Sequence, residues 1–192
     1  MGKIVYADYN ATTPMDSEVK KVFIDALDYY ANASSMHEDG RLVAKKIEEA
    51  RESVAKLINA NSDEIIFTSG GSESNNTVFS LALSPVLLQT SSAKAKWGGK
   101  RRVVTTKIEH PCVMESAKHL MRQGVDVAFL PVDSCGLVDM QEYKKLIAES
   151  QNTSDPQKKI LLASVMMANN EIGTIEPIKE MAHLANEAGI LF

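Results

Sequence analysis

The sequence predicts an α/β protein with a largely parallel sheet and helices on both faces of that sheet. Two observations lead to this fold class. Three short segments, 102–106, 125–130 and 160–166, are almost continuously apolar, as strands buried on both faces are. The segments 112–123 and 139–149 have the three-and-four spacing of amphipathic helices. Strands that alternate with helices in this way form parallel sheets.

The first third of the chain predicts two helices that pack on the sheet. Residues 1–15 form a lead-in segment, and Asp16 is placed to cap a helix whose apolar positions continue to Tyr30. A second amphipathic helix spans 42–58. After a turn-rich link, the apolar residues of 64–68 predict a short buried strand.

The rest of the chain continues the alternation, with one long connection. A helix follows the strand at 64–68 and runs to about Leu83. The connection 85–100 is long for this fold class and rich in lysine and arginine, so it is either a solvated surface insertion or a docking site for an acidic partner. A last helix, 177–188, ends before Gly189, and residues 190–192 begin another strand.

Length and composition indicate a globular protein and exclude several other classes. The 192 residues are 44% hydrophobic and 24% charged, which is enough to bury a sizeable core. The net charge of -4 argues against a nucleic-acid-binding protein. No stretch reaches the roughly 18 apolar residues of a membrane helix, and the first residues do not resemble a secretory signal. We therefore expect neither a nucleic-acid nor a membrane partner.

The two cysteines, Cys112 and Cys135, do not make a disulfide framework, and their spacing matches no zinc pattern. We expect no metal site, and we interpret both thiols as structural or incidental. This cysteine usage fits a reducing compartment. The cytoplasm is the expected location, with an organelle such as the mitochondrion as the alternative.

Three polar segments follow predicted strands, which is where ligands bind in open α/β sheets. Segment 68–75 has the sequence Thr-Ser-Gly-Gly-Ser-Glu-Ser-Asn and leads into a helix. The backbone N–H groups at a helix N-terminus can hold a phosphate, although a simple turn would also explain the glycines.

The second segment is Glu109-His110, and the third is 168–173, which contains Asn169 and Asn170. An imidazole at the end of a strand can stack on a planar cofactor and transfer protons near neutral pH, or it can be structural. Adjacent amides can form a turn or bind a ligand. Because all three segments meet at one edge of the sheet, ligand binding is favoured over each alternative.

Five segments in this order resemble the N-terminal part of the NifS/IscS-type cysteine desulfurases, which belong to the class V aminotransferase group of pyridoxal-phosphate enzymes. The segments are 8–14, 32–41, 67–76, 109–110 and 168–174. The resemblance implies a fold-type I large domain that is truncated. In that interpretation residues 16–192 form its N-terminal part, with the 85–100 insertion, and the C-terminal part of the large domain and the small domain are absent.

The resemblance also implies a cofactor, pyridoxal 5'-phosphate, and residues that contact it. Gly71 and Ser72 would hold the phosphate. His110 would stack on the pyridine ring and assist proton transfer, and Asn170 would bond near the 3-oxygen of the ring and the substrate.

The implied reaction converts L-cysteine to L-alanine and an enzyme persulfide, which supplies sulfur for iron–sulfur clusters or thiolation. Asn10, Ala11 and Thr12 would lie near the substrate. A homodimer and a scaffold protein that accepts sulfur are the implied partners.

The sequence departs from the family in ways that leave two alternatives. The Schiff-base lysine of the family lies in a Ser-x-His-Lys segment, its aspartate follows the strand that begins at Ile190, and its sulfur-accepting cysteine lies much later. None of these three is in the 192 residues, so we expect only non-covalent cofactor contacts. The alternatives to a cysteine desulfurase are a selenocysteine lyase, which resembles the same motifs, and an inactive fragment or pseudoenzyme.

Overall fold

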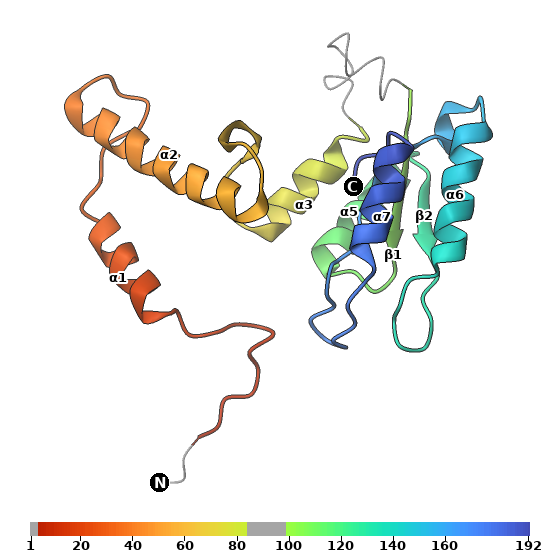
Figure 1. Ribbon diagram of the computed structural model, residues 1–192, viewed down its shortest axis with the longest axis horizontal. Helices are drawn as coiled ribbons and strands as arrows, with labels where there is room; N and C mark the ends of the chain where they lie inside the picture. Colours follow the sequence, from red (N-terminus) through yellow and green to blue (C-terminus); the bar gives the residue numbers. More distant parts are fainter. Residues whose placement is uncertain (1–3, 84–98) are drawn as a thin grey trace. The chain divides into compact units, whose positions relative to one another are not determined.

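The computed structural model describes residues 4–83 and 99–192, which fold as two compact units divided between Phe67 and Thr68 (Figure 1). All but the last two residues of the predicted insertion at 85–100 lie outside the described residues. Among the helices of the two described ranges, none is long and apolar enough to cross a membrane.

The first unit contains the two predicted helices. Helix α1 spans Ser17–Ala26, and the carboxylate of Asp16 caps it by accepting a hydrogen bond from the Glu18 N–H at 2.8 Å. Helix α2 spans Glu38–Ile58 and begins four residues before the predicted start. It starts early because His37 acts as its N-cap, with Nδ1 accepting a hydrogen bond from the Gly40 N–H at 3.2 Å.

The predicted strand at 64–68 is wrong. A short 3-10 helix, Ser62–Glu64, ends there, and Ile65 continues with extended backbone angles but without a partner strand among the described residues. Ile66 is 82% exposed. A strand needs the backbone of a neighbour to complete its hydrogen bonds, and this unit contains no described strand. For the same reason, no sheet within the unit covers the apolar faces of α1 and α2.

The second unit contains the predicted parallel sheet. Its strands are β1 (Arg102–Thr106), β2 (Val127–Leu130) and β3 (Ile160–Ala163), in the order β2-β1-β3 (Figure 1). Both pairings are parallel. Leu191 makes a parallel bridge to Leu162, so a fourth strand begins beside β3, as predicted.

The helices of the second unit lie within a few residues of their predicted positions. They are α3 (Gly71–Ser80), α5 (Pro111–Arg122), α6 (Met140–Asn152) and α7 (Ile178–Glu187), with a 3-10 turn at Pro156–Lys158. Gly189 follows α7 with a φ of 63°, and its N–H donates to Asn186 while the Ile190 N–H donates to Ala185. This Schellman motif ends the helix at the predicted glycine.

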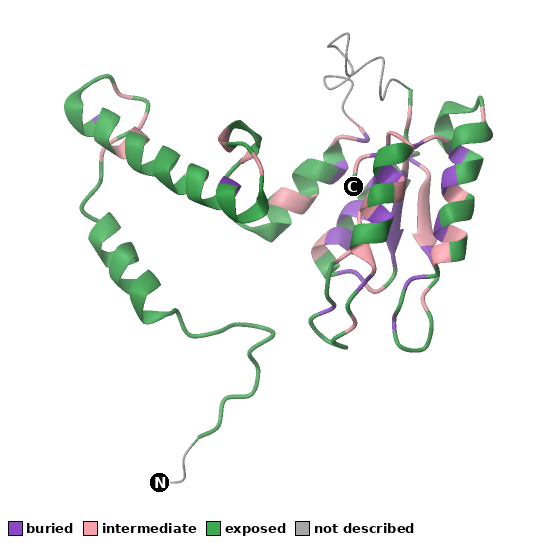
Figure 2. Ribbon diagram, viewed as in Figure 1, coloured by how far each residue is buried: buried purple, intermediate pink, exposed green. Residues whose placement is uncertain are grey.

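Helices cover both faces of the sheet, as predicted. The neighbouring residues Val103 and Val104 of β1 belong to different core clusters, because successive side chains of a strand point to opposite faces. Val103 packs in the cluster that contains Phe79 of α3 and residues of α5. Val104 packs with Tyr143 of α6 and Met181 of α7. Figure 2 shows this buried layer along the strands.

Candidate functional site

The loops that follow β1 and β3 are joined at the carboxyl edge of the sheet. Asn169 donates a hydrogen bond from Nδ2 to the carbonyl oxygen of Ile108 at 2.8 Å. The Met166 N–H donates to Oε1 of Glu109, also at 2.8 Å. The structure therefore brings the segment around Glu109-His110 and the segment around Asn169-Asn170 together, as the sequence predicts.

Glu109 is a buried carboxylate that connects the ends of two strands. Besides the Met166 N–H, its Oε1 accepts a hydrogen bond from the Thr106 hydroxyl at 3.3 Å. Burial raises the pKa of Glu109, and the negative charge of nearby Glu176 acts in the same direction. The sequence marks Glu109 only as the neighbour of His110. Its burial depends on the packing of the segment that follows β3, which contributes the Met166 N–H.

The two adjacent asparagines have different positions. Asn169 is buried, and its Oδ1 accepts hydrogen bonds from the N–H groups of Glu171 at 2.8 Å and Ile172 at 3.0 Å. It therefore shapes the loop. Asn170 is exposed and lines a pocket of about 220 Å³, together with Lys107 and others. Asn169 lines the same pocket, and Asn170 is the more exposed of the two amides.

The predicted phosphate segment forms the start of α3. Gly70 is its N-cap, and no side chain makes a capping hydrogen bond there. The first N–H groups of a helix have no acceptor within the helix. A Cβ atom built on Gly70 or Gly71 would meet no atom within 4 Å, so the space beside the backbone is open. Ser72 is exposed in the same turn. This arrangement fits an anionic group such as a phosphate.

Glu73 restricts where an anion can bind. Its carboxylate accepts a hydrogen bond from the Ser69 N–H at 2.6 Å, and the hydrogen bonds with Ser69 lower the pKa of Glu73. The Ser69 N–H is therefore already occupied. The N–H groups of Gly71 and Ser72 and the Ser72 hydroxyl are the donors that suit a phosphate.

Helix α3 and helix α5 run side by side and begin at the same end. Asn75 donates from Nδ2 to the Cys112 sulfur at 3.2 Å, and Ser116 donates from its hydroxyl to Oδ1 of Asn76 at 2.9 Å. His110 is the N-cap of α5, and its Nδ1 accepts a hydrogen bond from the Cys112 N–H at 3.2 Å. The parallel alignment brings the start of α3 and His110 to one end of the helix pair.

The Cys112 thiol contacts a predicted site residue, His110, although the sequence predicts only a structural or incidental role for this cysteine. Its sulfur lies 2.9 Å from Nδ1 of His110. Cys112 is partly buried and Cys135 is exposed, and neither forms a disulfide. This contact could have been predicted from the local sequence, because a cysteine two residues after a helix-capping histidine lies in the turn that the imidazole caps. Asn75 had no comparable signal, since its contact depends on the packing of α3 against α5.

Asn10, Ala11 and Thr12 belong to the first unit and are exposed. The N–H groups of Ala11 and Thr12 donate to the Asp8 carbonyl oxygen at 3.2 Å and 3.3 Å, which closes a turn in the lead-in segment. The placement of these three residues near the substrate stays a prediction.

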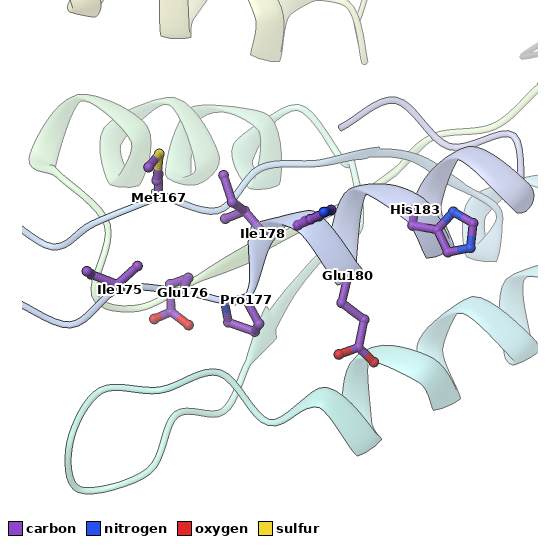
Figure 3. Close-up of a pocket in the computed structure, with 8 residues that line it drawn as sticks. Met167, Ile175, Glu176, Pro177, Ile178, Glu180 and His183 are labelled. Carbon is purple, nitrogen blue, oxygen red and sulfur yellow. The ribbon is translucent and has the colours of Figure 1, made fainter.

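A larger pocket lies at the start of α7 and holds none of the predicted site residues. Its volume is about 520 Å³, and Figure 3 shows Met167, Ile175 and Pro177 around it, with Glu180 and His183 on the helix. The lining is mostly apolar. Its chemistry does not match a phosphate, so the carboxyl edge of the sheet remains the candidate site.

Fold and site together define a parallel α/β protein in which a helix start that suits an anion and a histidine lie at the same end of a helix pair. Residues 5–192 match the family model of class-V aminotransferases, and the chain belongs to this family.

The relatives in this family include cysteine desulfurases. The chain is 44% identical to cysteine desulfurase IscS of Dictyoglomus turgidum, with 100% of this chain and 44% of the relative covered. It is 36% identical to the IscS of Rickettsia africae, with 98% and 42% covered. A solved NifS-like protein superposes with a TM-score of 0.77 at 33% identity, over 94% of this chain and 45% of the other. The chain thus spans less than half the length of these relatives.

Proposed function

We propose that the protein is a pyridoxal-phosphate-dependent cysteine desulfurase, which takes sulfur from L-cysteine and leaves L-alanine. The uncapped start of α3 beside His110 is the observation that carries this proposal. Family membership supports the choice of cofactor. One solved relative, at 30% identity and a TM-score of 0.78, is described as SspA in complex with cysteine, which supports L-cysteine as the substrate.

The proposed phosphate contacts come from the first turn of α3. The N–H groups of Gly71 and Ser72 and the hydroxyl of Ser72 hold the phosphate, and the helix dipole favours its negative charge. Because a Cβ on Gly71 would meet open space, the backbone there is accessible to the phosphate oxygens. When bound, the cofactor supplies an electron sink for the substrate carbon.

His110 and Asn170 act on the ring and the substrate in this proposal. His110 is exposed, and its Nδ1 is engaged by the first turn of α5, so Nε2 is the atom that can hold and move a proton. Its ring stacks on the pyridine ring. The Asn170 amide, at the 220 Å³ pocket, hydrogen-bonds near the 3-oxygen of the ring and the substrate. Asn10, Ala11 and Thr12 complete the substrate region.

The proposal extends to location and partners. With two cysteines, too few for a disulfide framework, the composition is consistent with a reducing compartment, and the proposed location is the cytoplasm. A cysteine thiolate of the enzyme would take the sulfur, with the electron pair of the broken C–S bond staying on the carbon that becomes alanine. An acceptor scaffold protein would receive the sulfur from the resulting persulfide. A homodimer is the proposed assembly.

Cofactor binding is tested by titrating the chain with pyridoxal phosphate and with pyridoxal, which lacks the phosphate. We expect clear preference for the phosphorylated form. Ser72→Ala removes one hydrogen bond to a charged oxygen, which corresponds to about 10- to 100-fold weaker binding. Ser80→Ala is the matched control, because Ser80 lies at the far end of the same helix and bonds to the Thr77 carbonyl. Equal affinity for both ligands would contradict the phosphate site.

The reaction is tested in a polypeptide that contains these 192 residues, with L-cysteine, pyridoxal phosphate and a thiol reductant. We expect alanine and sulfide in equal amounts, faster than with the cofactor alone, and loss of that excess in His110→Ala. Selenocysteine supplied in place of cysteine separates the desulfurase from a selenocysteine lyase. A rate equal to that of the free cofactor would contradict a catalytic role.

A further inference from the structure

Two groups of the same residue approach Nδ1 of His110. The Cys112 N–H lies 3.2 Å away and the Cys112 sulfur lies 2.9 Å away. A backbone N–H can only donate, so Nδ1 is the acceptor and carries no proton itself. In the neutral ring the proton is therefore on Nε2.

The direction of the sulfur contact follows from that assignment. Because Nδ1 has no hydrogen, the hydrogen between it and the sulfur belongs to the Cys112 thiol, which donates. The sulfur in turn accepts from Nδ2 of Asn75 at 3.2 Å, and an amide nitrogen can only donate. A directed chain of hydrogen bonds thus runs from Asn75 on α3, through the Cys112 sulfur, to the imidazole at the start of α5.

We propose that Cys112 and Asn75 are positioning residues that hold the His110 imidazole in the tautomer with the proton on Nε2. The inference rests on the proposed function, in which His110 meets the cofactor. In this tautomer the neutral ring presents a proton donor at Nε2, on the side away from α5. The same chain of hydrogen bonds links that ring to α3, the helix whose first turn holds the phosphate in the proposed function. The imidazole and the phosphate site are therefore held in a fixed relative position.

His37 provides a reference within the same chain. It is also a helix N-cap whose Nδ1 accepts a backbone N–H at 3.2 Å, from Gly40. The residue two positions after it is Asp39, where α5 has Cys112. The tautomer ratio of His37 therefore shows the effect of the backbone hydrogen bond alone. The difference between the tautomer ratios of His110 and His37 shows the effect of the thiol.

The test is a long-range proton–nitrogen NMR spectrum of the ligand-free chain with nitrogen-15 in its histidines, which distinguishes the two neutral tautomers from the imidazolium. His110→Gln assigns the signal. We expect the Nε2–H pattern for His110. In Cys112→Ala the ratio of the Nδ1–H to the Nε2–H form should rise about two- to tenfold, the range that one neutral hydrogen bond supports.

Two further variants separate positioning from packing. Cys112→Ser keeps a donor and an acceptor and should restore the wild-type ratio. Asn75→Ala should raise the ratio by itself but add nothing in the Cys112→Ala background, because Asn75 acts through the thiol. Ser116→Ala is the matched control, since the Ser116 hydroxyl bonds to Asn76 and to the Cys112 carbonyl oxygen but to neither the thiol nor His110.

The proposal would be overturned by an Nδ1–H or imidazolium signal for His110 in the wild type. It would also be overturned if Ser116→Ala changed the ratio as much as Cys112→Ala. The measurement uses no cofactor. Failure to bind pyridoxal phosphate would therefore count against the proposed function while leaving the tautomer result intact.

Discussion

The Asn169 side chain donates a hydrogen bond from Nδ2 to the Ile108 carbonyl oxygen at 2.8 Å, across 61 residues of sequence. Its Oδ1 accepts two further bonds, from Glu171 and Ile172, within its own loop. One buried amide thus fixes both loops that carry proposed cofactor contacts, the one with His110 and the one with Asn170. The shape of the site therefore depends on a buried residue that also lines the pocket.

Asn169→Ala should lower the free energy of unfolding by about 1–3 kcal/mol, because it leaves a carbonyl oxygen and two N–H groups of the loop without their partner. Denaturant unfolding followed by circular dichroism measures this change.

For its neighbour Asn170, we expect substitution to affect cofactor binding more than stability. Asn170 is exposed, so Asn170→Ala should lower the free energy of unfolding by less than Asn169→Ala does, while weakening pyridoxal-phosphate binding. A stable Asn169→Ala variant beside an unstable Asn170→Ala variant would contradict the roles assigned to the pair.

Gly40 and Gly71 should respond differently to alanine. A Cβ on Gly40 would lie 2.4 Å from the Ser35 carbonyl oxygen, which is backbone and cannot move aside cheaply. Gly40→Ala should therefore cost about 1–3 kcal/mol. A Cβ on Gly71 would meet nothing within 4 Å, so Gly71→Ala should be neutral or stabilise α3 by up to about 1 kcal/mol. Thermal unfolding of the two variants compares them directly, and equal losses would show that the contact at Gly40 is unimportant.

The buried carboxyl of Glu109 should make stability fall as pH rises. Burial raises its pKa above the ordinary value of 4.5, so between 4.5 and the raised pKa the folded state binds more protons than the unfolded state. Stability from this group is complete below 4.5 and is lost as pH rises through the raised pKa. The free energy of unfolding of Glu109→Gln, minus that of the wild type, should increase over this window in denaturant titrations.

Glu115 gives a control with the opposite sign. It is exposed on α5, and its hydrogen bond with Lys118 lowers its pKa. Its contribution is present above the ordinary pKa of a glutamate and is lost as pH falls through the lowered pKa. Glu115→Gln should therefore lose stability relative to the wild type as pH rises, by a smaller amount. The same sign for both variants would contradict burial as the cause at Glu109.

The elements that the sequence predicts well are those whose pattern is local. Strand β1 spans the predicted residues, Arg102–Thr106, because its apolar run and flanking turns leave few alternatives. Helix α5 begins at Pro111, and proline is favourable in the first turn of a helix. The segment 64–68 has an equally apolar pattern but forms no strand, because strand formation depends on a distant partner.

The residues of the candidate site also differ in whether local sequence or long-range packing determines their positions. The positions of Gly71, Ser72, His110 and Asn170 after apolar segments follow from the sequence, and their contact with a cofactor stays a prediction. The contact from Asn75 to Cys112 could not be predicted, since it depends on how α3 packs on α5. The distinction between Asn169 and Asn170 also required the structure, because identical neighbouring side chains carry no signal for which one is buried.

The most direct test of the central claim is to locate bound pyridoxal phosphate on the chain by backbone NMR. We predict saturable shifts of the Gly71 and Ser72 amides, together with shifts at His110 and Asn170, and much weaker effects with pyridoxal. Borohydride reduction of the same sample should label no single lysine preferentially. Shifts confined to the pocket that contains His183, or one specifically labelled lysine with the Gly71 and Ser72 amides unchanged, would contradict the proposed cofactor site.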